Sequence, residues 1–120
     1  MGSQNNYYKF DLEERTTEFG KRVIRLCAVL SKNSVNSRLA GQVTGSAGSV
    51  GANYREANDA LGKKDFIHRL RIARKEAKET IYWLKLVAEA NQKLSLEVEK
   101  LLKECTELRN ILSAIINKSI

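Results

Sequence analysis

The chain has 120 residues, no proline and a formal net charge of +7 at pH 7. This length is enough for one four-helix core but not for two domains, and the absence of proline permits long uninterrupted helices. No apolar run approaches the ~20 residues of a membrane span and no charged-then-apolar leader is present, so we expect a cytoplasmic protein with no membrane partner.

Residues 1–10 are largely polar and unpatterned, and we expect them to be a flexible segment ahead of a single domain at residues 11–120. The first helix is predicted to start after Asp11, whose side chain can cap the free backbone donors. Its apolar residues recur at three-, four- and seven-residue spacings, which places them on one helical stripe. This stripe comprises Leu12, Phe19, Val23, Leu26 and Leu30.

Three more helices are predicted, over residues 36–61, 63–91 and 95–118, with Gly62 as the stop after the second. Their core stripes are Leu39, Val43, Ala47, Val50, Tyr54, Ala57 and Leu61; Phe66, Leu70, Ala73, Ala77, Ile81, Leu84 and Ala88; and Val98, Leu101, Leu102, Cys105, Leu108, Leu112 and Ile115. Connections of only a few residues force sequential helices to lie antiparallel. The predicted fold is therefore an all-α, up-down-up-down four-helix bundle.

Four glycines lie inside the second helical pattern, and each costs about 1 kcal/mol relative to alanine, so a packing gain should offset them. Gly41, Gly45, Gly48 and Ala52 share one face of this helix, opposite its core stripe. We expect this glycine face to meet another subunit or an unusually close neighbour within the bundle. If Gly41, Gly45 and Gly48 instead face open solvent, the assembly hypothesis fails, together with the binding surface that it would build.

The positive charge is concentrated in the third helix, where residues 63–90 carry eight bases against four acids. Six of these bases fall within about a quarter of the circumference, opposite the core stripe, along a line roughly 30 Å long. Together with Tyr82 they form the basic face: Lys64, Arg71, Arg74, Lys75, Lys78, Tyr82 and Lys85. A basic stripe with an embedded aromatic suits an RNA or DNA backbone, with base stacking on the ring. The alternative is a solvated face that only aids solubility.

The remaining arc of the third helix carries Ile72, Trp83, Leu86 and Ala90 beside the core stripe. An exposed apolar patch of this kind usually marks an interface. Combined with the glycine face, it predicts a self-associating protein. The predicted oligomer interface comprises Gly41, Gly45, Gly48, Ala52, Ile72, Trp83 and Leu86.

No pattern in the sequence predicts catalysis, a metal or a cofactor. Asp65 and His68 have the spacing of two ligands on one helix, but the second pair and the facing glutamates of a di-iron bundle are missing. Cys27 and Cys105 fall in apolar stripes, so we expect free thiols that pack as small hydrophobes rather than nucleophiles. The run GSAGSVGAN has neither the preceding strand nor the closing Gly-Lys-Ser/Thr of a phosphate-binding loop.

Three acids, Glu56, Glu76 and Glu79, lie on partly apolar sectors and could serve as paired carboxylates. We expect them instead to pair with Arg55, Arg69 or the bases of another subunit. The predicted buried polar network comprises Asn53, Glu56, Glu76 and Glu79.

The chain resembles the four-helix-bundle family of 23S rRNA intervening-sequence proteins over residues 11–88. The resemblance is carried by DLEERTTEFGKRV, SAGSVGANYREANDALGKKDFI and RIARKEAKETIYWLKLV, and its most specific part is GSVGANYREAN followed by KKDF. Members of that family are small bacterial proteins, some encoded within 23S rRNA genes, and look like antiparallel bundles that form ring-like pentamers. The resemblance thus implies a homopentamer. The accessory variability protein of diversity-generating retroelements, which binds nucleic acid and a reverse transcriptase, is a more distant relative.

The resemblance carries over to these motif positions: Gly48, Ser49, Gly51, Ala52, Asn53, Tyr54, Glu56, Ala57, Lys63, Lys64, Asp65, Phe66, Glu76, Glu79, Tyr82 and Trp83. Gly45 stands where the family usually has arginine, which weakens a nucleic-acid role centred on the second helix. Gly62 replaces the usual serine, so the third helix loses a side-chain cap.

We therefore expect a non-enzymatic homo-oligomeric bundle, of a family without a defined biochemical role, that binds RNA or DNA through the basic face. The alternative is a scaffold or accessory subunit whose apolar surface docks a protein partner. An enzyme acting through Glu56, Glu76 and Glu79 would need these acids to converge on an accessible pocket.

Overall fold

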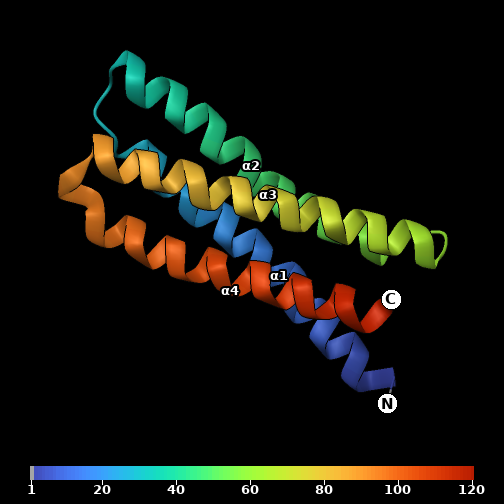
Figure 1. The fold of residues 1–120 in the computed structure, drawn as a ribbon. Coiled ribbons are helices and arrows are strands. Elements are labelled where there is room, and N and C mark those ends of the chain that lie inside the picture. The colour runs from blue at the N-terminus through green and yellow to red at the C-terminus, as the bar shows by residue number, and fades with distance from the viewer. Residues whose placement is uncertain (1) are drawn as a thin grey trace.

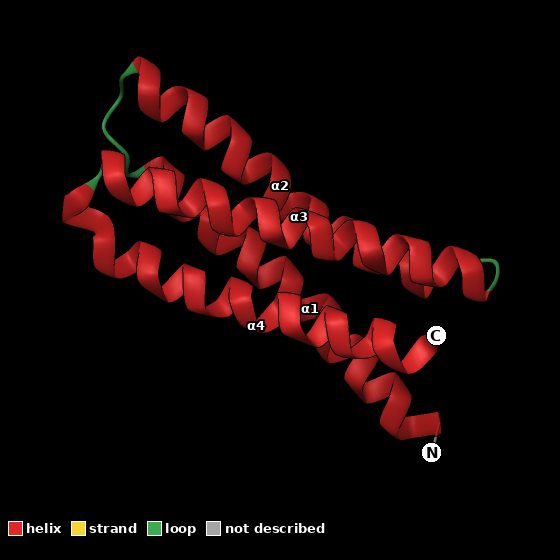
Figure 2. Cartoon of the chain, in the orientation of Figure 1, coloured by secondary structure: helices red, strands yellow, loops and turns green. Residues whose placement is uncertain are grey.

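The computed structural model describes the backbone of residues 2–120 and the side chains of residues 12–120. Four long helices account for nearly all of it: α1 (Gly2–Ala28), α2 (Ser34–Asn58), α3 (Lys63–Ala90) and α4 (Ser95–Ser119), with a 3-10 turn, η1 (Gln92–Leu94), before α4. No strand occurs within residues 2–120 (Figure 2). The prediction of an all-α four-helix bundle is confirmed.

The helices form an elongated body of 48 × 22 × 19 Å. The α2–α3 connection lies at one end, beside both chain termini, and the α1–α2 and α3–α4 connections lie at the other (Figure 1). Packing is most extensive between α2 and α3, then between α3 and α4, and sparsest between α1 and α4. Consequently α3 is held between two neighbours, and only its outward face is open.

Each helix buries one stripe in which residues recur at alternating three- and four-residue spacings, as in coiled coils. In α1 the stripe is Leu12, Thr16, Phe19, Val23 and Leu26, with Leu30 continuing it just after the helix end, and in α3 it is Ile67, Leu70, Ala73, Ala77, Thr80, Leu84 and Val87. Polar residues thus share the core: the hydroxyls of Ser46 and Thr80 lie 2.8 Å apart between α2 and α3. No buried side-chain nitrogen or oxygen among the described residues lacks a hydrogen-bond partner.

Three predicted details of the stripes are wrong. Leu61 is fully exposed rather than buried, because α2 ends at Asn58 and Leu61 falls in the connection. In α3, Phe66, Ile81 and Ala88 are only half-buried, and Ile67, Thr80 and Val87 take the inner positions. In α4, Leu102 and Ile115 are half-buried and Ile116 is buried. In α3 the buried residues follow a 3.5-residue seam that drifts from the 3.6-residue stripe used for prediction. That seam does not explain α4, where a seven-residue step from Leu108 would place Ile115 rather than Ile116 inside.

Helix boundaries also differ at two places. The backbone of α1 begins at Gly2, so Asp11 lies inside the helix rather than at its start. No proline or glycine between Gln4 and Asp11 interrupts the backbone hydrogen bonds, which explains the extension. Residues 1–10 were expected to be a flexible segment ahead of the domain; their backbone is helical from Gly2, and their side chains lie outside the described residues. At the start of α2, Asn33 is the cap, with its side chain accepting from the Asn36 N–H at 2.8 Å.

The start of α3 agrees with the sequence reading: Gly62 is its N-cap and supplies no side-chain hydrogen bond, while Asp65 lies in the first turn. Both cysteines are free thiols, with Cys105 buried and Cys27 half-buried. None of the helices within residues 2–120 is long and apolar enough to cross a membrane.

Candidate nucleic-acid interface

The basic face of α3 is open to solvent over its whole length. Lys64, Arg71, Lys75, Lys78 and Lys85 are exposed, and Arg74 is half-buried. Lys64, Arg71, Lys78 and Lys85 recur every seven residues, which is about 10 Å along the helix axis. The structure therefore presents four of the six predicted cations in one row along the outside of the bundle, with Arg74 and Lys75 beside that row.

None of these six cations is ion-paired with an acidic side chain among the described residues. Four arginines outside this face are ion-paired, among them Arg15 with Glu104 at 2.8 Å, Arg55 with Glu13 at 3.2 Å and Arg69 with Asp65 at 3.8 Å. Arg22, Arg38 and Arg109 have no ion pair among the described residues. An unpaired cation can bind an external anion without first breaking an internal ion pair. The cations of the basic face are therefore free to bind an external anion, because none of them belongs to an internal ion-pair network.

Tyr82 lies among these cations with 56% of its surface exposed. Its ring contacts Trp83 in an edge-to-face geometry, with ring centroids 5.1 Å apart and planes at 69°. Lys78 and Lys85 lie four residues before and three residues after it, which are neighbouring positions on a helix surface. The aromatic ring is thus held by Trp83 and flanked by positive charge.

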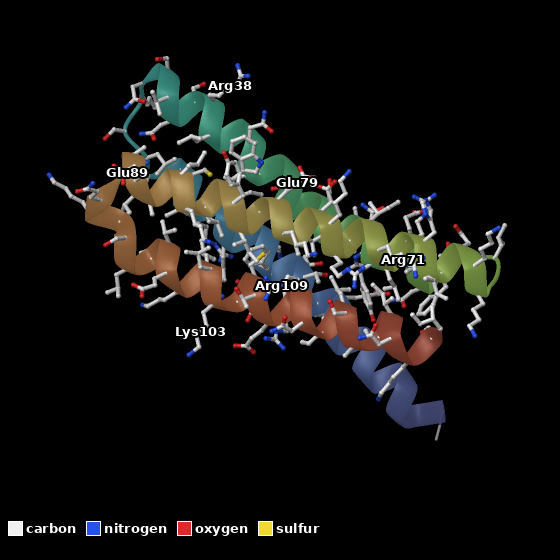
Figure 3. All side chains as sticks on the ribbon, viewed as in Figure 1. Arg38, Arg71, Glu79, Glu89, Lys103 and Arg109 are labelled. Carbon is white, nitrogen blue, oxygen red and sulfur yellow. The ribbon has the colours of Figure 1, made fainter. Side chains whose placement is uncertain are left out.

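The basic surface continues across the α3–α4 contact, which sequence reasoning missed. Arg74 Nη1 donates to Ser113 Oγ of α4 at 3.5 Å, and the half-buried Arg109 of α4 binds the Asn110 side chain rather than an acid. In Figure 3 Arg71 and Arg109 lie on the α4 side of α3, and Glu79 lies on the α2 side. No signal in the sequence could have shown this, because α4 is balanced in charge and its rotation against α3 is set by packing.

The glycine face does not contact a close neighbour within the bundle, so that alternative is wrong. Gly41, Gly45, Gly48 and Ala52 are exposed, and a Cβ built on any of the three glycines would meet nothing within 4 Å. These glycines face open space in the single chain, which is the outcome stated above to defeat the glycine-based assembly hypothesis, so any subunit contact or binding surface needs a different basis. The close approach occurs instead at Gly51, where a Cβ would lie 3.1 Å from Thr16 Oγ1 of α1.

The apolar part of the predicted interface is largely covered by the chain itself. Ile72, Trp83 and Leu86 are half-buried, and Trp83 and Leu86 pack against the core. The most exposed large apolar side chains lie elsewhere: Ile24, Val29, Val35, Leu61, Leu96 and Ile120. The patch on α3 is therefore smaller than the sequence suggested.

The predicted buried polar network is also wrong for the single chain. Glu56 and Glu79 are exposed, Asn53 and Glu76 are half-buried, and the Asn53 amide donates to Ser49 O of its own helix at 2.9 Å. Arg55 and Arg69 are engaged by Glu13 and Asp65, so they do not pair with the three acids. Partial burial raises the pKa of Glu76, with the charge of Glu79 adding to the effect and Lys75 opposing it.

Neither cysteine has the environment of an activated nucleophile. Burial raises the pKa of Cys27, and burial raises that of Cys105 to about 12, which disfavours a thiolate at either position. Among the described side chains, no group of three His, Cys, Asp or Glu residues is placed to hold a metal ion. A hollow of about 760 Å³ lies at the start of α3, but its lining is mainly basic and apolar, including Leu61, Lys63, Lys64, His68 and Arg71.

Comparison with known proteins agrees with this architecture. The family model of the 23S rRNA-intervening sequence protein matches residues 9–114. A crystal structure of a protein of unknown function from the S23 ribosomal protein family of Bacteroides thetaiotaomicron superposes with a TM-score of 0.79 at 34% sequence identity, covering 91% of this chain and 97% of that one. No curated protein matches the sequence. From the matched span and the shared fold, the chain belongs to the 23S rRNA-intervening sequence protein family.

Proposed function

We propose that this protein is a non-enzymatic bundle that binds nucleic acid through the basic face of α3. The observation that carries the proposal is the group of six cations, five of them exposed and none ion-paired among the described residues. A polyanion that contacts such a group releases its condensed counterions, which favours binding and makes it steeply dependent on salt. The family connection with rRNA genes is consistent with an RNA or DNA ligand.

The proposal is tested by an electrophoretic shift assay with structured RNA and duplex DNA over a range of salt. The test variant replaces Arg71, Arg74, Lys75 and Lys78 with glutamine, which removes four positive charges from the face. The matched control replaces Lys21, Lys32, Arg38 and Lys93, which are exposed and carry the same charge elsewhere.

Binding that weakens in the test variant, with a smaller salt slope, and persists in the control supports the proposal. If the two variants lose affinity equally, the attraction is only the net charge of the protein, and the proposal fails. If the wild-type chain gives no shift at low salt, it fails as well.

We also propose that the antiparallel bundle self-associates into a closed homo-oligomer, a pentamer by analogy with its family. The support is the flank of α3 facing α2, where Trp83 and Leu86 remain partly exposed and Glu76 and Glu79 have no ion-pair partner among the described residues. Light scattering on the purified protein measures the mass directly. A strictly monomeric mass at high protein concentration excludes this part of the proposal.

The same flank supports the second candidate function, a scaffold or accessory subunit with a protein partner and no direct role in binding nucleic acid. Pull-down from a bacterial lysate, with and without nuclease, separates the two. Partners that are lost after nuclease treatment indicate nucleic acid, and partners that are retained indicate a protein contact.

A further inference from the structure

We propose that the ligand of the basic face is single-stranded nucleic acid, with an unpaired base stacked on Tyr82. This inference rests on the proposed nucleic-acid binding and specifies its substrate class. It comes from the placement of one exposed aromatic ring inside a row of unpaired cations.

The exposure of Tyr82 distinguishes it from the other described aromatic residues. Tyr54 and Phe19 are buried in the core, and Phe66 and Trp83 are half-buried, while 56% of the Tyr82 surface is open. Among the described residues the one ring that it contacts is Trp83, edge to face, and more than half of the Tyr82 surface stays open to a ligand.

The charges around Tyr82 favour a nucleic-acid strand over a neutral aromatic ligand. Lys78 and Lys85 flank it on the basic face, and Lys75 lies two turns earlier on the same side. Glu79 lies three residues before Tyr82 and is therefore also a neighbour on the helix surface, on the α2 side of α3 (Figure 3), so this one acid is outnumbered by the three lysines. A backbone that follows the cations would thus bring its bases past the ring.

Duplex DNA or RNA cannot make the same contact. The faces of paired bases are stacked inside a duplex, so a surface ring can stack only on an unpaired base. A helix can read a duplex from within the major groove, but α3 is flanked closely by α2 and α4 along its length (Figure 1). Only phosphate contacts remain for a duplex, to which Tyr82 can add its hydroxyl but not the face of its ring.

The test measures fluorescence anisotropy with a labelled mixed-sequence 20-mer and with the blunt duplex of the same sequence, at one salt concentration. The variants are Tyr82→Ala and Tyr82→Phe, the second of which keeps the ring. Tyr82→Ala should weaken single-strand binding by about 5- to 100-fold and leave duplex binding within about twofold. Tyr82→Phe should bind the single strand as the wild type does.

Equal losses for strand and duplex, or no loss for either, overturn the inference, as does a Phe variant that is as weak as the Ala variant. A change of oligomeric mass in Tyr82→Ala would place the ring in a subunit contact and would also overturn it. If the four-glutamine variant loses binding while Tyr82→Ala does not, the proposed function stands and this inference falls. If the wild type binds neither probe, both fail.

Discussion

Asn36 and Asn91 exchange two side-chain hydrogen bonds where the start of α2 packs beside the end of α3. Nδ2 of Asn36 donates to Oδ1 of Asn91 at 2.9 Å, and Nδ2 of Asn91 donates back to Oδ1 of Asn36 at 2.8 Å. The second proton of each amide is used as well, on Ser31 O and Val87 O, both within 2.9 Å. The pair therefore fixes the start of α2 against the end of α3 with every amide proton satisfied.

This pair predicts a large coupling between the two asparagines. Asn91→Ala should destabilise the protein by about 1–3 kcal/mol, because it leaves one amide proton and the side-chain oxygen of the buried Asn36 without a partner. Replacing both residues by alanine should cost less than the sum of the single changes. Urea unfolding of the two single variants and the double variant measures the coupling, and additive losses would show that the amides act independently.

The bidentate contact of Arg15 with Glu104 predicts a strong tie between α1 and α4. Arg15 Nε and Nη2 donate to Glu104 at 2.8 and 2.9 Å, and Nη2 also donates to Glu107 at 3.0 Å. Arg15→Lys keeps the charge but loses the two-bond contact of the guanidinium with the carboxylate. We expect the free energy of unfolding to fall by about 1–2 kcal/mol, as measured by thermal unfolding. The exposed pair of Arg25 and Glu18 is the control, and Arg25→Lys there should change stability by less than about 0.5 kcal/mol.

The raised pKa of Glu76 predicts a pH-dependent stabilising substitution. Because burial disfavours the carboxylate, the folded protein holds this proton at a higher pH than the unfolded chain does. Glu76→Gln should therefore raise Tm at neutral pH, and its advantage should vanish as the pH falls through the raised pKa and the wild-type side chain becomes neutral. Calorimetric scans at about pH 7 and about pH 4 check this. An advantage that grows on acidification would contradict the assignment.

The open glycines of α2 predict opposite effects on folding and on assembly. Gly41→Ala, Gly45→Ala and Gly48→Ala should each stabilise the fold by about 0.5–1 kcal/mol, because each new methyl group meets open space and restricts the unfolded chain. Gly51→Ala is the control, and it should stabilise the fold less than the other three changes do, because its Cβ would lie 3.1 Å from Thr16 Oγ1 and the Thr16 side chain would have to shift. Urea unfolding curves measure these changes in the free energy of unfolding.

The same variants test the glycine face as a subunit contact. If another subunit packs closely there, the added methyl groups should lower the mass seen by light scattering while the fold becomes more stable. An unchanged mass in the triple alanine variant would exclude the glycine face from any subunit contact.

Most of the core was predictable because apolar spacing depends only on the local helix. Leu12 through Leu30 and Val98 through Leu108 lie where the pattern placed them, apart from the half-buried Leu102. Thr16, Ser46 and Thr80 were missed because a polar side chain carries no apolar signal, although the seven-residue seam passes through each of them. Leu61 was misplaced because a helix end one turn earlier shifts it from the core into a loop.

The candidate site likewise has one part that the sequence predicts and another that depends on how the helices pack. The cations of α3 share one helix, so their common face follows from spacing alone. Arg109 joins them only through the packing of α4 on α3, and the positions of Glu56 and Glu79 depend on how α2 lies against α3. Such relations between helices need coordinates, since no residue spacing encodes them.

The uneven packing of the bundle has a consequence for its motions. With the sparsest seam between α1 and α4, the first helix is held mainly by α2, by the close approach at Gly51 and by the two-bond contact of Arg15 with Glu104. Partial opening should therefore begin by α1 peeling away, with its amides exchanging deuterium before those of α3. Because α3 stays packed between α2 and α4 during such local opening, the row of cations on its outer side would keep its shape.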